Sequence, residues 1–130
     1  MYMLDTNTCI FAIKRNPRIL ARLLACDPAE ICISSITYAE LCLGVEKSRF
    51  ADRNRLALML FLSEIEIAPY DAATSEEYGA LRASLERNGT PIGPLDMLIA
   101  SHAKALGAVI VTNNLREFKR VQGLQTEDWA

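Results

Sequence analysis

The sequence predicts an α/β fold in which helices flank a parallel β-sheet. Short apolar runs alternate along the chain with segments of helical periodicity, which is typical of a sheet built from strand–helix–strand units. One of these runs, residues 108–111, is apolar throughout, as expected for a central strand buried on both faces. The 130 residues show no internal repeat, linker or low-complexity segment, so residues 1–130 are expected to form a single domain.

Turn and cap residues divide the first half of the chain into two strands and four helices. The apolar start stops at Asp-Thr-Asn, and Asn16-Pro17 separates two helical patterns because proline suits the first turn of a helix. Ser34-Ser35 can cap the helix that follows the second strand. In order, we expect a strand over 1–4, a helix over 8–14, a helix from 17 to the break at Asp27-Pro28, a strand over 30–34, and helices over 35–46 and 51–63.

Glycine and proline mark the boundaries in the second half of the chain. Asn88-Gly89 and Gly107 each close a helical pattern, since glycine readily adopts the left-handed conformation that follows many helices. Residues 89–94 read as a loop. In order, we expect a strand over 64–69, helices over 71–88 and 95–106, the strand over 108–111 and a short edge strand over 124–126.

The composition is that of an ordinary globular protein, with 51% hydrophobic residues and a net charge of −2. This charge argues against bulk, non-specific nucleic-acid binding, although basic residues gather at 14–22, 47–55 and 116–120. Each basic cluster alone is typical of a solvated helix face. No signal peptide is visible, and no apolar run approaches the roughly 20 residues of a membrane span, so a cytoplasmic location is expected.

Cysteine and histidine do not form a recognisable metal-binding pattern. The four cysteines include no Cys-x-x-Cys pair, and with one histidine the spacings of zinc sites are missing. We therefore expect the cysteines to be buried, reduced thiols. His102 lies on an apolar helical stripe, which favours a core histidine with its polar atoms satisfied.

Three acidic residues far apart in the sequence stand where an apolar run gives way to a turn or helix. Asp5 follows the first strand, Glu40 lies in the helix after the second strand, and Asp96 begins a later helix. The carboxyl ends of parallel strands form one rim, where ligands bind, so these side chains can meet. Because clustered carboxylates repel one another, the pattern favours a site for a hard divalent cation.

Each acid also has a simpler explanation. Asp5 could only cap a helix, a task that neighbouring threonine or asparagine side chains could share. Glu40 shares a helix face with Ile36 and Leu43, so it is expected to be partly buried and could pair with an arginine instead. Asp96 lies in the first turn of a helix, where the helix dipole favours a carboxylate, and shares its face with small alanines.

Polar residues also follow the strand over 108–111. Thr112 and Asn114 could cap the turn that follows, or they could orient a water molecule or a phosphate oxygen. Glu117 comes shortly afterwards and could add a fourth carboxylate.

Taken with these residues, the chain resembles the PIN-domain ribonucleases, and more closely the VapC toxins of bacterial toxin–antitoxin pairs, in the enterobacterial-type subgroup. The resemblance covers essentially the full chain, and the motifs are specific in this order. The matching stretches are Met3–Ile10, Ile33–Leu41, Gly89–Ala103 and Val111–Phe118, and the tail Glu127–Trp129 also fits.

The resemblance implies a sheet of strand order 3-2-1-4-5 and a Mg²⁺ ion, or Mn²⁺ in its place, held by Asp5, Glu40 and Asp96. It implies endonucleolytic cleavage of structured RNA, with tRNA anticodon loops as the expected substrate. It also implies inhibition by a cognate antitoxin and assembly as a homodimer within a larger toxin–antitoxin complex. Apolar residues among Leu56–Leu62 are candidates for the surface that pairs two subunits.

One departure concerns Asn114, which stands where many PIN domains carry a fourth acid. An amide oxygen is a neutral, weaker ligand, so a second metal site would require Glu117 to turn inward. The mechanism we expect has Asp5 and Asp96 as metal ligands, Glu40 holding and deprotonating the attacking water, and Thr112 and Asn114 orienting water or phosphate oxygens.

Two other classes of protein share some of these features. A phosphoacceptor receiver domain has a similar length and an acidic Mg²⁺ pocket, but it requires an acid pair after the first strand, whereas this chain has the single Asp5. A catalytically weak module that binds RNA or protein is the other alternative, suggested by the missing fourth acid.

Overall fold

Five parallel strands form the centre of the fold, in a computed structural model that describes residues 1–130. Their order is β3 (Glu66–Ala68), β2 (Ile31–Ser34), β1 (Tyr2–Leu4), β4 (Val109–Val111) and β5 (Thr126–Glu127). Met3 of β1 lies opposite Cys32 of β2 and Ile110 of β4. The order confirms the expected topology and differs from the 2-1-3-4-5 order of receiver domains.

Strands and helices alternate along the chain, as the sequence predicted. The elements are β1 (Tyr2–Leu4), α1 (Thr6–Ile13), α2 (Pro17–Ala25), a 3₁₀ turn (Pro28–Glu30), β2 (Ile31–Ser34), α3 (Ser35–Lys47), α4 (Ala51–Leu62), β3 (Glu66–Ala68), α5 (Ala72–Arg87), α6 (Pro94–Leu106), β4 (Val109–Val111), α7 (Leu115–Phe118) and β5 (Thr126–Glu127).

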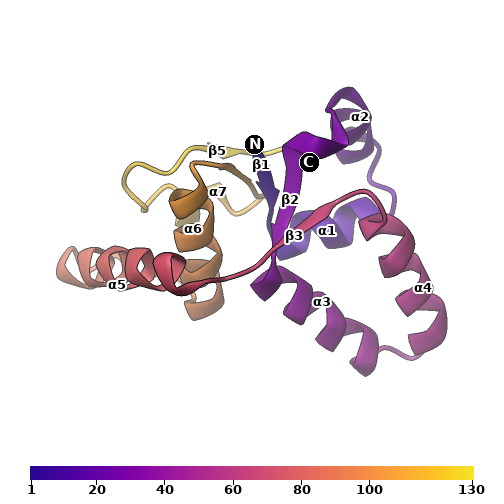
Figure 1. Cartoon of the computed structure of the whole chain (residues 1–130), viewed down its shortest axis with the longest axis horizontal. Helices are drawn as coiled ribbons and strands as arrows, with labels where there is room; N and C mark the ends of the chain where they lie inside the picture. Colours follow the sequence, from indigo (N-terminus) through magenta and orange to yellow (C-terminus); the bar gives the residue numbers. More distant parts are fainter.

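Helices cover both faces of the sheet, with α1 to α4 on one side and α5 to α7 on the other (Figure 1). Successive side chains of a strand point to opposite faces, so each strand contributes to both cores. In β1, Met3 packs with α5 and α6, whereas Leu4 packs with α1 and α3. Ile110 and Val111 divide in the same way in β4, which confirms its burial on both faces.

The sequence prediction missed two short elements, the 3₁₀ turn Pro28–Glu30 and α7, and it placed the ends of several others differently; for example, β3 is Glu66–Ala68 instead of 64–69. The helix α7 was not predicted, because a helix of 4 residues is too short to show a periodicity. The helix α1 begins at Thr6 rather than at residue 8, since Asp5 caps it directly. The last strand is Thr126–Glu127 instead of 124–126.

Most of the smaller expectations for the core are confirmed. His102 is 1% exposed, Ser34 caps α3, and all four cysteines are free thiols. Cys9 and Cys32 are buried as expected, but Cys26 and Cys42 are only half-buried, so the expectation of burial is wrong for these two. None of the helices combines the length and apolar character that crossing a membrane requires.

Gly107 makes the transition from α6 to the central strand possible. Its φ of 65° lies in the left-handed region, and the N–H of Ala108 donates to the carbonyl of Ala103, as in a glycine-terminated helix. The chain therefore turns within two residues from the helix that carries Asp96 into β4.

We expect Gly107→Ala to lower the free energy of unfolding by about 1 kcal/mol, because a Cβ disfavours the left-handed conformation. The matched control is Gly79→Ala, within α5, where a Cβ would meet no atom within 4 Å. That substitution should raise the free energy of unfolding by about 0.5–1 kcal/mol. Chemical denaturation measures both; equal effects of the two substitutions would contradict this explanation.

Candidate active site

Four acidic side chains from four different elements face one another at the carboxyl-end rim of the sheet. Burial, followed by the negative charges of Asp5, Glu117 and Glu40, raises the pKa of Asp96 from 3.8 to about 6. Hydrogen bonding to Glu117 contributes further. Charges influence one another this strongly only at short range, so the fold brings together the three predicted acids and the possible fourth.

Asp5 is both a helix cap and a member of this cluster. It is 3% exposed, and its Oδ1 accepts a hydrogen bond of 2.8 Å from the N–H of Thr8 in the first turn of α1. Burial raises the pKa of Asp5, while hydrogen bonds from Thr112 and Thr8 oppose the rise. The capping explanation is therefore correct, and it fixes the carboxylate at the end of β1.

Glu40 is held by a threonine and not by an arginine. The hydroxyl of Thr6, in the first turn of α1, donates a hydrogen bond of 2.7 Å to Oε1 of Glu40 on α3. None of the five ion pairs of the chain includes Glu40, so the expected arginine alternative is wrong. On the face that the helix pattern proposed, Glu40 is half-buried as expected and Ile36 packs against the core, whereas Leu43 is 59% exposed.

Asp96 occupies the first turn of α6, where its charge interacts favourably with the helix dipole. The helix begins without a side-chain cap at Gly93, and a Cβ there would lie 3.7 Å from Oδ2 of Asp96. On the same face, Ala100 and Ala103 are fully buried, as the sequence predicted. Their small side chains allow α6 to pack closely against the sheet.

Asn114 and Glu117 act together. The side-chain amide of Asn114 donates a hydrogen bond of 2.9 Å to Oε2 of Glu117, and the backbone N–H of Asn114 donates to the hydroxyl of Thr112 at 2.9 Å. Glu117 thus turns inward and places a carboxylate beside Asp96. The fourth negative charge comes from Glu117, and Asn114 orients it.

Sequence reasoning missed two residues of this rim. Thr6 directly follows Asp5, and its position in Asp-Thr-Asn was the only available signal for its contact with Glu40. Asp128 follows β5, and its charge adds to the rise in the pKa of Asp5. No pattern in the sequence around Asp128 indicated that it would lie near Asp5.

The donor atoms of the cluster suit a hydrated divalent cation. Carboxylate oxygens are the ligands that Mg²⁺ and Mn²⁺ prefer. The side chains form no ready-made cage of three or more His, Cys, Asp or Glu ligands. Mg²⁺ does not require such a cage, because it keeps several of its water molecules and takes only one or two carboxylates directly.

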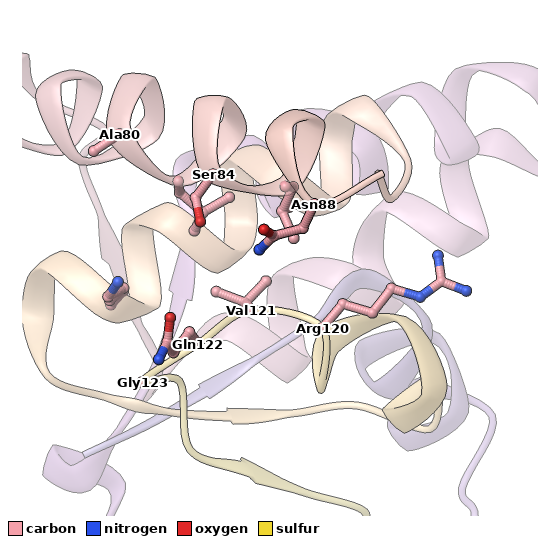
Figure 2. A pocket seen from close by; sticks show the side chains of 10 residues that line it. Ala80, Ser84, Asn88, Arg120, Val121, Gln122 and Gly123 are labelled. Carbon is pink, nitrogen blue, oxygen red and sulfur yellow. The ribbon is translucent and has the colours of Figure 1, made fainter. Parts of the chain in front are cut away.

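One hollow of the surface adjoins the acids, and another that is similar in size does not. A cavity of about 370 Å³ between α1, α3 and α4 has Glu40 at its edge. The other, of about 310 Å³, lies between α5, α6 and the turn after α7, where Ser84 and Asn88 face Val121 and Gln122 (Figure 2). None of the clustered acids lines this second hollow.

Comparison with known proteins places this chain in a family. The family model described as "PIN domain" matches residues 2–124. The chain belongs to the PIN-domain family, in its VapC branch. This VapC-family chain is 48% identical over 129 residues to the tRNA(fMet)-specific endonuclease VapC of Shigella flexneri. The alignment covers 99% of this chain and 98% of that relative.

Solved structures of VapC-family complexes have the same fold. The structure of DNA-bound VapBC from Salmonella typhimurium matches with a TM-score of 0.94 and 48% identity, covering 99% of this chain and 98% of that one. VapBC2 from Rickettsia felis, bound to a DNA fragment from its promoter, matches with a TM-score of 0.94, 45% identity and the same coverage.

We expect Asp96→Asn to stabilise the metal-free VapC-family chain at pH 7. The raised pKa of Asp96 means that the folded state binds the proton more tightly than the unfolded chain, so the unfolding free energy falls as pH rises from 3.8 to about 6. Removing the charge should restore on the order of 1 kcal/mol, after allowance for solvent screening of this half-exposed group.

Thermal unfolding with EDTA between pH 4 and pH 8 measures this effect. The matched control is Glu64→Gln, which removes a charge from an exposed turn and should leave the melting temperature unchanged. A lower melting temperature for Asp96→Asn than for the parent at pH 7 would contradict the picture of repelling carboxylates.

Proposed function

We propose that this chain is the toxin of a VapBC-like toxin–antitoxin pair and acts as a Mg²⁺-dependent endoribonuclease. The observation that carries the proposal is the set of four facing carboxylates with a raised pKa at Asp96. A fold gains no stability from such repulsion, so the arrangement is best explained by binding of a cation. Structured RNA is the proposed substrate, with cleavage in the tRNA anticodon loop, and the name of the Shigella flexneri relative supports a tRNA target.

Asp5 and Asp96 would hold the cation, Mg²⁺ or Mn²⁺. When bound, the cation supplies positive charge that stabilises the attacked phosphate group and makes water more acidic. Asp5 directly follows β1 and Asp96 lies in the first turn of α6; both elements are anchored in the cores, so the packing around the sheet sets the positions of the two carboxylates. A net negative chain with an acidic rim also needs this positive charge to accept RNA.

Glu40 is the proposed general base. It is half-buried at the edge of the cavity between α1, α3 and α4, and it can accept a proton from the attacking water. The hydrogen bond from Thr6 occupies Oε1 and fixes the orientation of the side chain, which leaves Oε2 for the water. Thr6 is therefore a positioning residue for this step.

Thr112 and Asn114 serve mainly to order the acids in this proposal. The Thr112 hydroxyl hydrogen-bonds Asp5 and accepts from Asn114, while the Asn114 amide holds Glu117. We also propose that Thr112 and Asn114 help to orient water or phosphate oxygens during the reaction.

The proposed partners are a cognate antitoxin and a second copy of the chain. The antitoxin follows from the VapBC complexes that share the fold. Leu56, Met59 and Leu60 on α4 are 56%, 63% and 66% exposed, and such an apolar face suits a subunit contact. We also propose that the protein acts in the cytoplasm, where its RNA substrate is found.

Asp5→Asn should abolish RNA cleavage without unfolding the chain. Asparagine caps a helix as well as aspartate, so α1 should persist, while the lost charge should weaken cation binding and lower kcat by about 100-fold or more. The assay is cleavage of total tRNA by the antitoxin-free protein, with Mg²⁺ and with EDTA. Cleavage by Asp5→Asn at the parent's rate, or cleavage in EDTA, would refute the proposal. Glu64→Gln is the control expected to cleave like the parent.

Thr6→Val should lower kcat by roughly 10-fold and leave KM unchanged, because valine has the same shape but cannot hydrogen-bond Glu40. Thr6→Ser keeps the hydroxyl and should retain most of the activity. Steady-state kinetics on a tRNA substrate separate the two parameters. Equal rates for the valine and serine variants would show that the hydrogen bond does not orient the base.

A further inference from the structure

His102 is a buried, polar side chain that the proposed reaction does not use. It lies on α6 and is 1% exposed, and its Nδ1 is 2.7 Å from the hydroxyl oxygen of Ser34. Burial lowers the pKa of His102, with the charge of Asp71 and backbone hydrogen bonding to Pro69 opposing the change. The ring is therefore neutral at pH 7 and has one acceptor nitrogen.

The hydroxyl of Ser34 satisfies two groups at once. Its oxygen accepts a hydrogen bond of 3.1 Å from the N–H of Ile36, which caps α3. Its proton is then free to be donated to Nδ1 of His102. The contact between Ser34 and His102 is thus a buried hydrogen bond in which the hydroxyl donates and the ring nitrogen accepts.

This hydrogen bond joins the two helices that carry Glu40 and Asp96. Glu40 is six residues after Ser34 on α3, and Asp96 is six residues before His102 on α6. At the rise of an α-helix, each acid lies about 9 Å along its helix from the hydrogen bond. A rotation or shift of either helix at this point would move its carboxylate at the rim.

Tyr70 supports the same junction from the segment between β3 and α5. Its backbone N–H donates to the hydroxyl of Ser35 at 3.0 Å, and its phenol oxygen is 2.9 Å from the hydroxyl of Ser101. Its ring packs edge-on against His102, with 5.3 Å between ring centres. The first turn of α3 and the middle of α6 are therefore linked twice by polar contacts.

We propose that His102 is a positioning residue which, through Ser34, sets the placement of α6 against α3 and so the spacing of Asp96 and Glu40. The inference rests on the proposed function, since it assigns the spacing to a cation site. Displacing a reacting group by about 1 Å can cost 100-fold in rate, so a buried contact of this kind can control activity from a distance.

Three variants test the proposal. His102→Leu removes the acceptor, whereas His102→Asn can place an amide oxygen near the position of Nδ1. Ser34→Ala removes the donor and the α3 cap together, so its matched control is Asn16→Ala, which removes the cap of α2 away from this junction. The measurements are Mn²⁺ affinity by calorimetry without RNA, thermal unfolding, and kcat and KM for tRNA cleavage.

The expected result is a folded His102→Leu protein with roughly 10-fold weaker Mn²⁺ binding and a 10- to 100-fold lower kcat at unchanged KM. His102→Asn should recover most of both, and Asn16→Ala should lose stability only. If His102→Leu does not fold, the same comparison between Ser34→Ala and Asn16→Ala decides the question.

The inference would be overturned if folded His102→Leu bound Mn²⁺ and cleaved tRNA as well as the parent chain does. It would also be overturned if Ser34→Ala and Asn16→Ala changed the Mn²⁺ affinity equally. A parent chain that binds Mn²⁺ but cuts no RNA would refute the proposed function, and the affinities would still test His102. A parent chain that binds no Mn²⁺ would overturn both.

Discussion

Repulsion among the carboxylates of Asp5, Glu40, Asp96 and Glu117 is the constraint on which the rest of this structure depends. Burial, followed by this repulsion, raises the pKa of Asp96. The repulsion destabilises the folded chain, and the packed cores on both faces of the sheet must offset this free-energy cost. The cores do so by holding the segments that carry the four acids in fixed places. A cation that binds to the cluster would relieve the repulsion and so stabilise the folded chain.

Short hydrogen bonds from uncharged groups keep the acids in place without cancelling their charge. Thr6 holds Glu40, Asn114 holds Glu117, and the N–H of Thr8 holds Asp5. An arginine in any of these roles would have satisfied the carboxylate and left nothing for a cation. An uncharged contact also joins the helices that carry Glu40 and Asp96, because the neutral ring of His102 hydrogen-bonds Ser34 at the start of α3.

The sequence revealed the features that depend on regular patterns. The strand order followed from the family resemblance. Asp5 was identifiable at the end of a strand, Glu40 within the helix that follows a strand, and Asp96 in the first turn of a helix behind a glycine–proline loop. The Glu40–Thr6 contact was not predictable, since 34 residues separate the partners and only the tertiary fold brings them together. The short helix α7 and the place of Asp128 near Asp5 likewise depend on how β4 and β5 pair. The exposure of Leu43 could not be predicted either, because it depends on which neighbours the tertiary fold brings to that turn of α3.

The central claim is that these carboxylates bind a divalent cation at the rim of the sheet. The most direct measurement is anomalous X-ray diffraction from crystals of the chain soaked in millimolar Mn²⁺. We expect an anomalous peak in contact with the carboxylates of Asp5 and Asp96, and its loss in Asp5→Asn crystals. Crystals with no peak at the rim, or with Mn²⁺ bound only elsewhere on the surface, would contradict the account.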